Sequence, residues 1–292
     1  MTVLARPAPV ARASEVRVAA GSRHLGRSAR TLFGGIVVPL ASFGAAIAAW
    51  YAVTYLVLSP ERRFLLPPPH QVLTNSMLDW THLKPMLEAL VVTTQVAAVG
   101  FAVAAAIGVG VGVLMSRARW LERAIYPYAV VLQVIPILAI VPLIGLWFGY
   151  GMFARVLVCV IIAAFPIITN THFGLQSVDR GQHELFTLAR ASAWDRLRKL
   201  ELPSALPSIL TGIRTAAGLV VVGAIIGDMF FAKGEPGIGT LLDVYRSRLQ
   251  SEDLFAAIVL ASLLGVAVFM LFGALSKVLI GNWHSSADTS KK

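Results

Sequence analysis

Long runs of apolar residues recur along the chain, with short polar segments between them. A helix needs about 20 mostly apolar residues to cross a bilayer. Six runs meet this requirement, and they cover about residues 34–58, 87–115, 125–148, 153–174, 208–231 and 255–280. The pattern therefore predicts an all-α polytopic membrane protein with six transmembrane helices.

These runs divide the chain into three parts. A basic tail covers residues 1–33, a six-helix membrane domain covers 34–280, and a second tail covers 281–292. The first tail lacks the apolar core of a secretory signal, so the first span is expected to act as an uncleaved targeting signal. Its Arg-rich composition is also typical of an organelle transit peptide, although a disordered basic tail that reinforces orientation is the simpler interpretation.

The distribution of cations predicts which side of the membrane each segment faces. If six spans are counted, both tails, the segment around residue 120 and the loop at about 175–207 share one side. Together with Lys277 at the end of the last run, these segments carry 17 Lys and Arg residues, against seven on the other side. Because cytoplasmic segments are enriched in Lys and Arg, both termini and the 175–207 loop are predicted to be cytoplasmic.

Composition supports a membrane protein and excludes other classes. Hydrophobic residues make up 57% of the chain and charged residues 14%, whereas soluble domains have about 25% charged residues. The net charge of +10 lies beside the apolar runs and not on a basic face with interleaved aromatics, so no nucleic-acid partner is expected. The single cysteine, Cys159, can form no intrachain disulfide, has no metal-ligand neighbours and is predicted to be buried.

Small residues and prolines inside the runs indicate tight, kinked helices. Small residues at four-residue spacing let helices approach closely; they are Ala104, Gly108, Gly112, Gly223 and Gly227. Prolines within a span remove a backbone hydrogen bond and kink the helix; they are Pro136, Pro142 and Pro166. Such helices suit a transport pathway, but they also occur in static membrane proteins.

Polar side chains deep in an apolar run are costly and mark functional candidates. Those that could line a translocation pathway are Gln95, Gln133, Asn170 and Asp228. For the first three, the alternative is a hydrogen bond between helices. For Asp228, which lies near the outer end of its run, the alternative is hydration at the membrane interface.

The charged loop at about 175–207 has the signals of two short helices. Asp179 followed by Gln182, and Ser192 followed by Asp195, are both helix-capping patterns. Each expected helix carries an apolar face at helical spacing. The two faces consist of Leu185, Leu188 and Ala189, and of Trp194, Leu197 and Leu200. Such a face must pack either on its own bundle or in a groove of another protein, and spacing does not decide between them.

The loop resembles that of a known family. The stretch Glu184-Leu185-Phe186-Thr187-Leu188-Ala189-Arg190, followed by Leu202-Pro203-Ser204-Ala205-Leu206-Pro207, is similar to the cytoplasmic coupling loop of permease subunits in binding-protein-dependent ABC importers. Further motifs resemble the branch that handles nitrate, sulfonates, taurine and related small solutes; they include Pro127-Tyr128, Leu146-Trp147-Phe148-Gly149-Tyr150-Gly151 and Phe165-Pro166. One departure is the missing glycine after Arg190, so the turn between the helices is expected at residues 191–193.

The resemblance implies a type I ABC importer permease fold in a bacterial inner membrane. It implies membrane lipid, two ATPase subunits, a second permease copy (the same chain or a sister chain) and a periplasmic solute-binding protein as partners. The cargo would be a small solute such as a sulfonate, taurine or nitrate. The residues that match the ATPase-docking loop are Glu184, Leu185, Leu188, Ala189, Ser192, Trp194, Leu197, Leu202 and Pro203.

Two other classes of function compete with this interpretation. The chain has no Gly-x-x-x-x-Gly-Lys-Ser/Thr motif, so ATP would be used by a partner subunit and no cofactor is expected on this chain. An intramembrane enzyme is disfavoured because there is no Gly-x-Ser-x-Gly, no His-Glu-x-x-His and no carboxylate pair in facing spans. An ATP-independent channel or secondary carrier explains the glycines and prolines but not the capped loop.

Overall fold

The computed structural model describes residues 25–231 and 233–280, and the described chain contains helices but no strands. It forms two units, residues 1–53 and 54–292. The first unit contains α1 (Leu25–Ala52), which the π-helical turn η1 (Val53–Val57) continues. Residues 25–33, predicted to belong to the basic tail, are therefore helical, while residues 1–24 and 281–292 lie outside the described residues.

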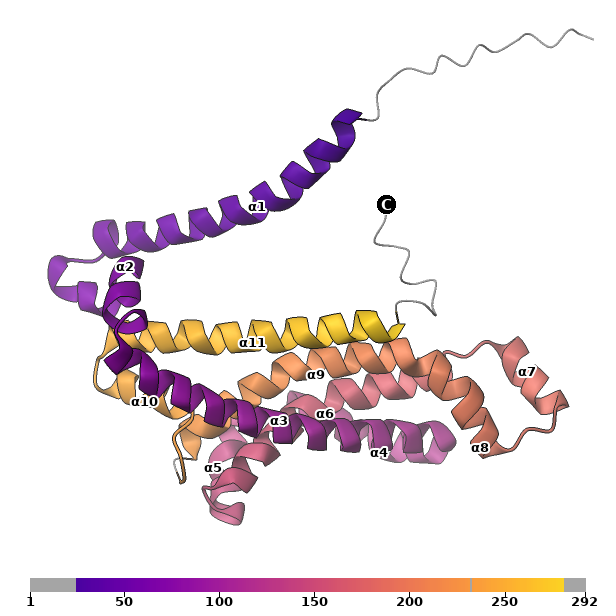
Figure 1. Cartoon of the computed structure of the whole chain (residues 1–292). Coiled ribbons are helices and arrows are strands. Elements are labelled where there is room, and N and C mark those ends of the chain that lie inside the picture. Colours follow the sequence, from indigo (N-terminus) through magenta and orange to yellow (C-terminus); the bar gives the residue numbers. More distant parts are fainter. Residues whose placement is uncertain (1–24, 232, 281–292) are drawn as a thin grey trace, which may run out of the picture. The chain divides into compact units, whose positions relative to one another are not determined.

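The second unit carries the rest of the helices (Figure 1). The short helices that precede α3 are η2 (Pro60–Leu65), α2 (Pro69–Gln71) and η3 (Val72–Met77). The long and short helices that follow are α3 (Trp80–Arg117), α4 (Arg119–Val134), α5 (Ile137–Phe148), α6 (Met152–Gln176), α7 (Arg180–Leu188), α8 (Ala193–Arg196), η4 (Leu197–Glu201), α9 (Leu202–Phe230), α10 (Ile238–Ser247) and α11 (Ser251–Ile280).

Five segments of the described chain are long and apolar enough to span a membrane. They are Val37–Val57, Trp80–Arg117, Met152–Gln176, Ala193–Phe230 and Ser251–Leu279. The pair formed by α4 and α5 passes the same test only when the two helices are taken together as one broken span. The predicted all-helical architecture is confirmed. The third apolar run differs from the prediction because it forms two helices and not one.

The third span is not the kinked helix predicted at 125–148. Its first helix, α4, already begins at Arg119, and its axis meets that of α5 at 103°. Pro136 occupies the N-cap of α5, and the preceding Ile135 has an extended ψ of 125°. Because proline lacks an N–H and disfavours helical geometry in the residue before it, the helix stops here completely.

The centre of the second unit is formed by α3, α6 and α9, which pack side by side (Figure 1). A Cβ atom on Gly108 would lie 2.7 Å from Cβ of Ile167, and one on Gly223 would lie 3.0 Å from Cα of Cys159. Helices this close require glycine at the crossing, as the small-residue spacing predicts. Cys159 is buried in this core, as predicted.

The long helix α3 begins seven residues before the predicted span because Asp79 caps it. The carboxylate of Asp79 accepts hydrogen bonds from the backbone N–H of Thr81 at 2.9 Å and from its hydroxyl at 2.6 Å. Such bonds favour the ionised form, so the pKa of Asp79 lies below its ordinary value. The cap satisfies an N–H group that the first turn of a helix otherwise leaves free.

The short helices of the second unit mark its two ends (Figure 1). The helices α7 and α8 lie at one end, called here the loop end, and α2 and α10 lie at the other, called the distal end. The long helices α3, α6, α9 and α11 run between them. Charged connections are thus concentrated at the ends, and the apolar spans lie between.

Candidate functional site

The charged loop at the loop end begins with a capped helix. The Asp179 carboxylate accepts the backbone N–H of Gly181 at 2.7 Å, and α7 follows directly. The Ser192 hydroxyl accepts the N–H of Asp195 at 3.1 Å and donates to the Asp195 carboxylate at 2.6 Å. Both predicted caps are confirmed, and each starts the helix that the sequence predicts.

The turn between α7 and α8 is made without glycine. Arg190 adopts a left-handed φ of 50°, the backbone N–H of Arg190 donates to Thr187 O at 3.0 Å, and that of Ala191 donates to Phe186 O at 3.0 Å. This pair of bonds is the Schellman ending of a helix, in which glycine is the usual left-handed residue. The turn therefore centres on Arg190, one residue before the predicted 191–193.

Side-chain contacts tie the two loop helices together. The Arg196 guanidinium on α8 donates to the Thr187 hydroxyl on α7 at 3.1 Å. Lys199 and Asp195 form an ion pair at 2.7 Å one turn apart. The short loop is thus a single folded piece and not a flexible connection.

The apolar face of this loop is exposed. The side chains of Leu188, Trp194 and Leu185 are 83%, 66% and 63% exposed. Other members of the predicted docking set are also exposed, namely Glu184, Ala189, Ser192 and Pro203. Of the two alternatives that the spacing left open, packing on its own bundle is not what the described chain shows for Leu185, Leu188 and Trp194. It is what the chain shows for Leu197 and Leu200 of the second face, both of which are buried.

One member of the predicted docking set is placed differently. Leu197 is buried and packs against Leu175, Ala205 and Ile209, so it anchors the loop to the bundle and presents no surface to a partner. Leu200, which shares the expected face of Leu197, is buried as well. Leu202 is half-buried at the start of α9 and shares the same cluster.

The loop is also joined to the loop end of α3. The Arg117 guanidinium, at the last residue of α3, forms an ion pair with the Glu201 carboxylate in η4. Glu201 is buried, and partly buried charge pairs are screened less than exposed ones. The loop is therefore joined both to α9, through Leu197, and to α3, through Arg117.

The polar residues of the spans differ in exposure. Gln95 on α3 and Gln133 near the end of α4 are exposed on the isolated chain. Asn170 is half-buried, and its amide donates to Pro166 O of the same helix at 2.8 Å. This hydrogen bond stays within α6, so the role that it shows for Asn170 is local.

Asp228 lies in a buried polar cluster at the distal end. Its side chain is 0% exposed, its Oδ1 lies 3.2 Å from Nη1 of Arg155, and its Oδ2 accepts the Thr93 hydroxyl at 2.6 Å. Arg155 is 3% exposed and donates from Nε and Nη2 to Phe231 O at 3.0 and 2.6 Å. The cluster joins α3, α6, α9 and the segment after α9, so Asp228 faces neither a pathway nor hydrating water in the described chain.

The segment between α9 and α10 closes over this cluster. Ile238 donates its backbone N–H to the Thr93 hydroxyl at 2.8 Å, and the Thr240 hydroxyl donates to Asp228 O at 2.7 Å. A Cβ atom on Gly239 would lie 2.8 Å from Cβ of Asp228. Glycine is required here because the backbone passes against Cβ of Asp228 and the carbonyl of Ile225.

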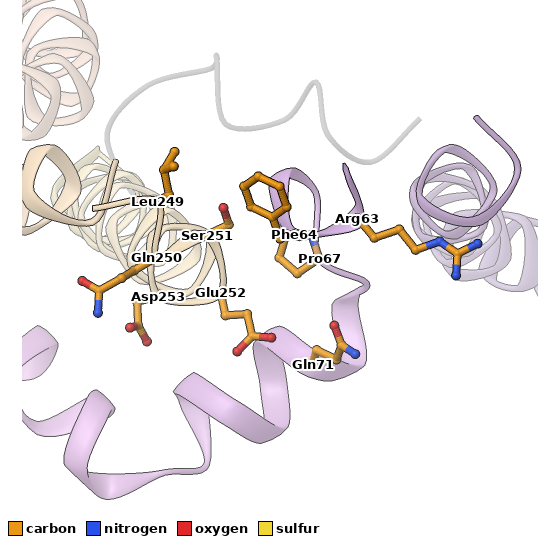
Figure 2. A pocket seen from close by; sticks show the side chains of 9 residues that line it. All are labelled: Arg63, Phe64, Pro67, Gln71, Leu249, Gln250, Ser251, Glu252 and Asp253. Atoms are coloured by element: carbon orange, nitrogen blue, oxygen red, sulfur yellow. The ribbon is translucent and has the colours of Figure 1, made fainter. Parts of the chain in front are cut away.

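A second polar site at the distal end is an open pocket of about 390 Å³ (Figure 2). It lies between the connector that follows η1, with Arg63 and Phe64, and the turn between α10 and α11. In that turn Leu249 adopts a left-handed φ of 59° and is 62% exposed. The carboxylates on this side are already paired, since Glu252 accepts from the Asn75 amide at 3.1 Å and Asp253 contacts His82 at 2.9 Å.

Sequence reasoning missed the partners in these sites. Arg117, Arg155 and Thr93 were not singled out, although an arginine inside an apolar run is itself a signal of a buried partner. Arg155 lies near the start of α6 and was counted only as an outer cation. Its carboxylate partner is 73 positions away along the chain, and no local spacing connects the two.

The chain was compared with families of known proteins. Residues 80–281 match the model of the family described as binding-protein-dependent transport system inner membrane component. This range contains α3 to α11, and so includes the charged loop and the Asp228 cluster, but only the α10–α11 side of the distal pocket.

Individual relatives agree with the family match. The chain is 34% identical over 222 residues to the formylaminopyrimidine transport permease protein ThiX of Halalkalibacterium halodurans, which covers 74% of this chain and 85% of ThiX. It is 32% identical over 203 residues to the putative aliphatic sulfonates transport permease protein SsuC of Escherichia coli, covering 69% and 75%. The crystal structure of an amino acid ABC transporter with histidines has the same fold, with a TM-score of 0.55 at 18% identity, covering 70% of this chain and 95% of that chain.

Proposed function

Because this chain belongs to the family of inner-membrane components of binding-protein-dependent transport systems, we propose that its charged loop docks onto an ATPase subunit and couples ATP hydrolysis to transport. The chain is a permease component of an ABC importer and not an enzyme. ATP is bound and hydrolysed by the partner, and this chain needs no cofactor. Two ATPase subunits serve two permease chains.

The observation that carries the docking proposal is the exposed apolar face of α7 and α8. Leu185, Leu188 and Trp194 present large hydrophobic side chains at the loop end, outside the apolar spans. Exposed apolar groups on a folded, capped piece mark a surface that another protein covers. A helix laid into a groove is recognised through side chains at this i, i+3 spacing.

The translocation pathway is proposed to lie between two permease copies. Gln95 and Gln133 are exposed on the single chain, and an amide facing lipid is costly. A second copy would enclose both amides in a polar passage, and the bend beside Gln133 allows α5 to move against α4. Of the other two predicted pathway residues, Asp228 does not line this passage because it pairs with Arg155. Asn170 stabilises its own helix.

A periplasmic binding protein is proposed to deliver the solute at the distal end. The pocket of Figure 2, which the exposed Leu249 and Phe64 both line, supplies an irregular surface there. The membrane is the bacterial inner membrane, and the positive-inside rule places the loop end and both termini in the cytoplasm.

We propose that the cargo is a small solute, either charged or uncharged. The sequence predicted an anion such as a sulfonate, taurine or nitrate. One relative is named for formylaminopyrimidine and another for aliphatic sulfonates. These are an uncharged heterocycle and an anion, so membership of the family does not select a sulfonate, taurine or nitrate. Uptake assays with both classes of solute separate them.

Co-purification tests the docking proposal. The tagged chain is extracted gently from its native membrane, and mass spectrometry identifies the proteins that accompany it. We expect a Walker-motif ATPase in roughly equal amount, and we expect Leu188→Asp to reduce its recovery about 30-fold, as losing an interface hot spot of about 2 kcal/mol would.

The matched control is Leu78→Asp, which places the same charge on a similarly exposed leucine at the distal end. The control should retain the ATPase. Recovery of the chain alone after cross-linking would favour the ATP-independent channel and leave the loop without a partner. Equal recovery of the ATPase with Leu188→Asp would show that the ATPase does not dock on this face.

A further inference from the structure

The loop end carries a basic pocket that the proposed transport function does not use. The pocket has a volume of about 500 Å³ and is lined by Arg119, Glu122, Arg123, Tyr126 and Pro127, all from α4. Arg119 and Arg123 are exposed and lie four residues apart, so both guanidinium groups rise from one face of the helix. Among the described residues, neither arginine forms an ion pair with a carboxylate.

The one acidic residue in the pocket is directed elsewhere. Oε1 of Glu122 lies 3.2 Å from Nε2 of His172, which is fully buried on α6. The carboxylate therefore holds α4 against α6 and is partly withdrawn from the two arginines. Two guanidinium groups and the Tyr126 hydroxyl remain as donors, and together they fit an anion with several acceptor oxygens.

The position of the pocket identifies the source of that anion. Arg119 follows two residues after Arg117, which ends the apolar span α3 and contacts Glu201 of the charged loop. Trp120 and Tyr128 are 68% and 73% exposed beside the pocket, and large aromatic side chains are enriched where a span meets the membrane surface. A basic pocket at this level faces lipid headgroups.

We propose that this pocket binds the phosphate group of an anionic phospholipid, with Arg119 and Arg123 as its main contacts and the Tyr126 hydroxyl as a further donor. The lipid would fix the start of α4, the first arm of the bent span, at the membrane surface. The inference depends on the membrane location of α3 and α4 and not on the transported solute or on ATPase docking.

Lipid binding to the purified full chain tests the proposal. Delipidated protein in neutral detergent is titrated with phosphatidylglycerol or phosphatidylcholine of identical acyl chains, and native mass spectrometry counts the lipids retained. We expect one phosphatidylglycerol to bind about 30-fold more tightly than phosphatidylcholine, since each of the two arginines near the headgroups contributes about 1 kcal/mol. Arg119→Gln/Arg123→Gln should abolish this preference.

The control pair is Arg62→Gln/Arg248→Gln, which removes the same charge from exposed arginines elsewhere and should keep the preference. Equal affinity of the two lipids for the wild-type chain, or equal loss in the control, would overturn the proposal. Displacement of phosphatidylglycerol by millimolar inorganic phosphate would overturn the lipid assignment in favour of a soluble anion.

Two conservative variants keep the proposal testable if the glutamine pair does not fold. Arg119→Lys/Arg123→Lys retains both charges but loses the forked guanidinium geometry, and Tyr126→Phe removes only a hydroxyl. We expect each to weaken phosphatidylglycerol binding about two- to threefold. Unchanged binding in both would overturn the proposed contacts, and this result is independent of whether an ATPase co-purifies.

Discussion

Single residues have their largest effect on stability in the buried cluster at the distal end. Asp228→Asn keeps the shape of the side chain but leaves the Arg155 guanidinium, which is 3% exposed, without a counter-charge. Removing one partner of a buried ion pair costs about 3–5 kcal/mol. We expect a large fall in the thermal unfolding midpoint of the detergent-purified chain.

Two control variants test whether the loss of stability in Asp228→Asn comes from the unpaired charge of Arg155. Glu88→Gln breaks the ion pair of Glu88 with Lys84, whose side chains are both more than half exposed, and should cost less than about 0.5 kcal/mol. Arg155→Met/Asp228→Leu removes both charges and should recover most of the loss. If Asp228→Asn abolished transport with an unchanged midpoint, Asp228 would contact the solute after all.

At this scale, the range of an interaction determines whether the sequence reveals it. Asp179 and Ser192 were predicted as caps because each bonds a backbone N–H within three residues. Arg155 and Asp228 meet only after α6 and α9 pack, so nothing local predicts their contact. Arg190 lies between these cases. Its left-handed turn is local, but the sequence lacks the glycine that usually marks such a turn.

At the scale of elements, length and apolar composition predicted where the spans lie but not their shape. The range 153–174 agrees closely with α6 because a run of that length can only be helical in a bilayer. Pro136 predicted a kink, yet the observed break of 103° depends on how α5 packs on α6 and α9. Similarly, no residue pattern predicted the π-helical turn at 197–201.

The bend between α4 and α5 can be measured directly. Spin labels at Tyr128→Cys and Leu146→Cys, both exposed in the described chain, would be about 27 Å apart along a straight helix of 18 residues. With the observed bend the same rise per residue places them about 17 Å apart. Pulsed electron paramagnetic resonance on the Cys159→Ala background distinguishes the two values.

The reference pair is Val91→Cys with Ile107→Cys on α3, which is continuous over this range. Its labels should be about 24 Å apart, as expected for 16 residues of straight helix. A long distance for the first pair, close to that of a straight helix, would contradict the broken span.

At the scale of the whole molecule, two arginines show that the bent pair crosses the membrane once. Arg117, just before α4, contacts Glu201 at the loop end. Arg155, just after α5, contacts Asp228 and Phe231 at the distal end. The chain therefore passes from one end of the bundle to the other through α4 and α5, which supports counting the bent pair as a sixth candidate span of the described chain.

Six spans give a topology that chemical labelling tests. Single cysteines at Leu188 and Leu249, exposed at the loop end and the distal end, are introduced on the Cys159→Ala background. A membrane-impermeant maleimide applied to intact spheroplasts should label Leu249→Cys and reach Leu188→Cys only after permeabilisation. An even number of spans then puts both termini on the side of Leu188, where the excess of Lys and Arg also lies. Labelling of Leu188→Cys in intact spheroplasts would reverse the orientation, and a partner ATPase in the cytoplasm could not reach the loop.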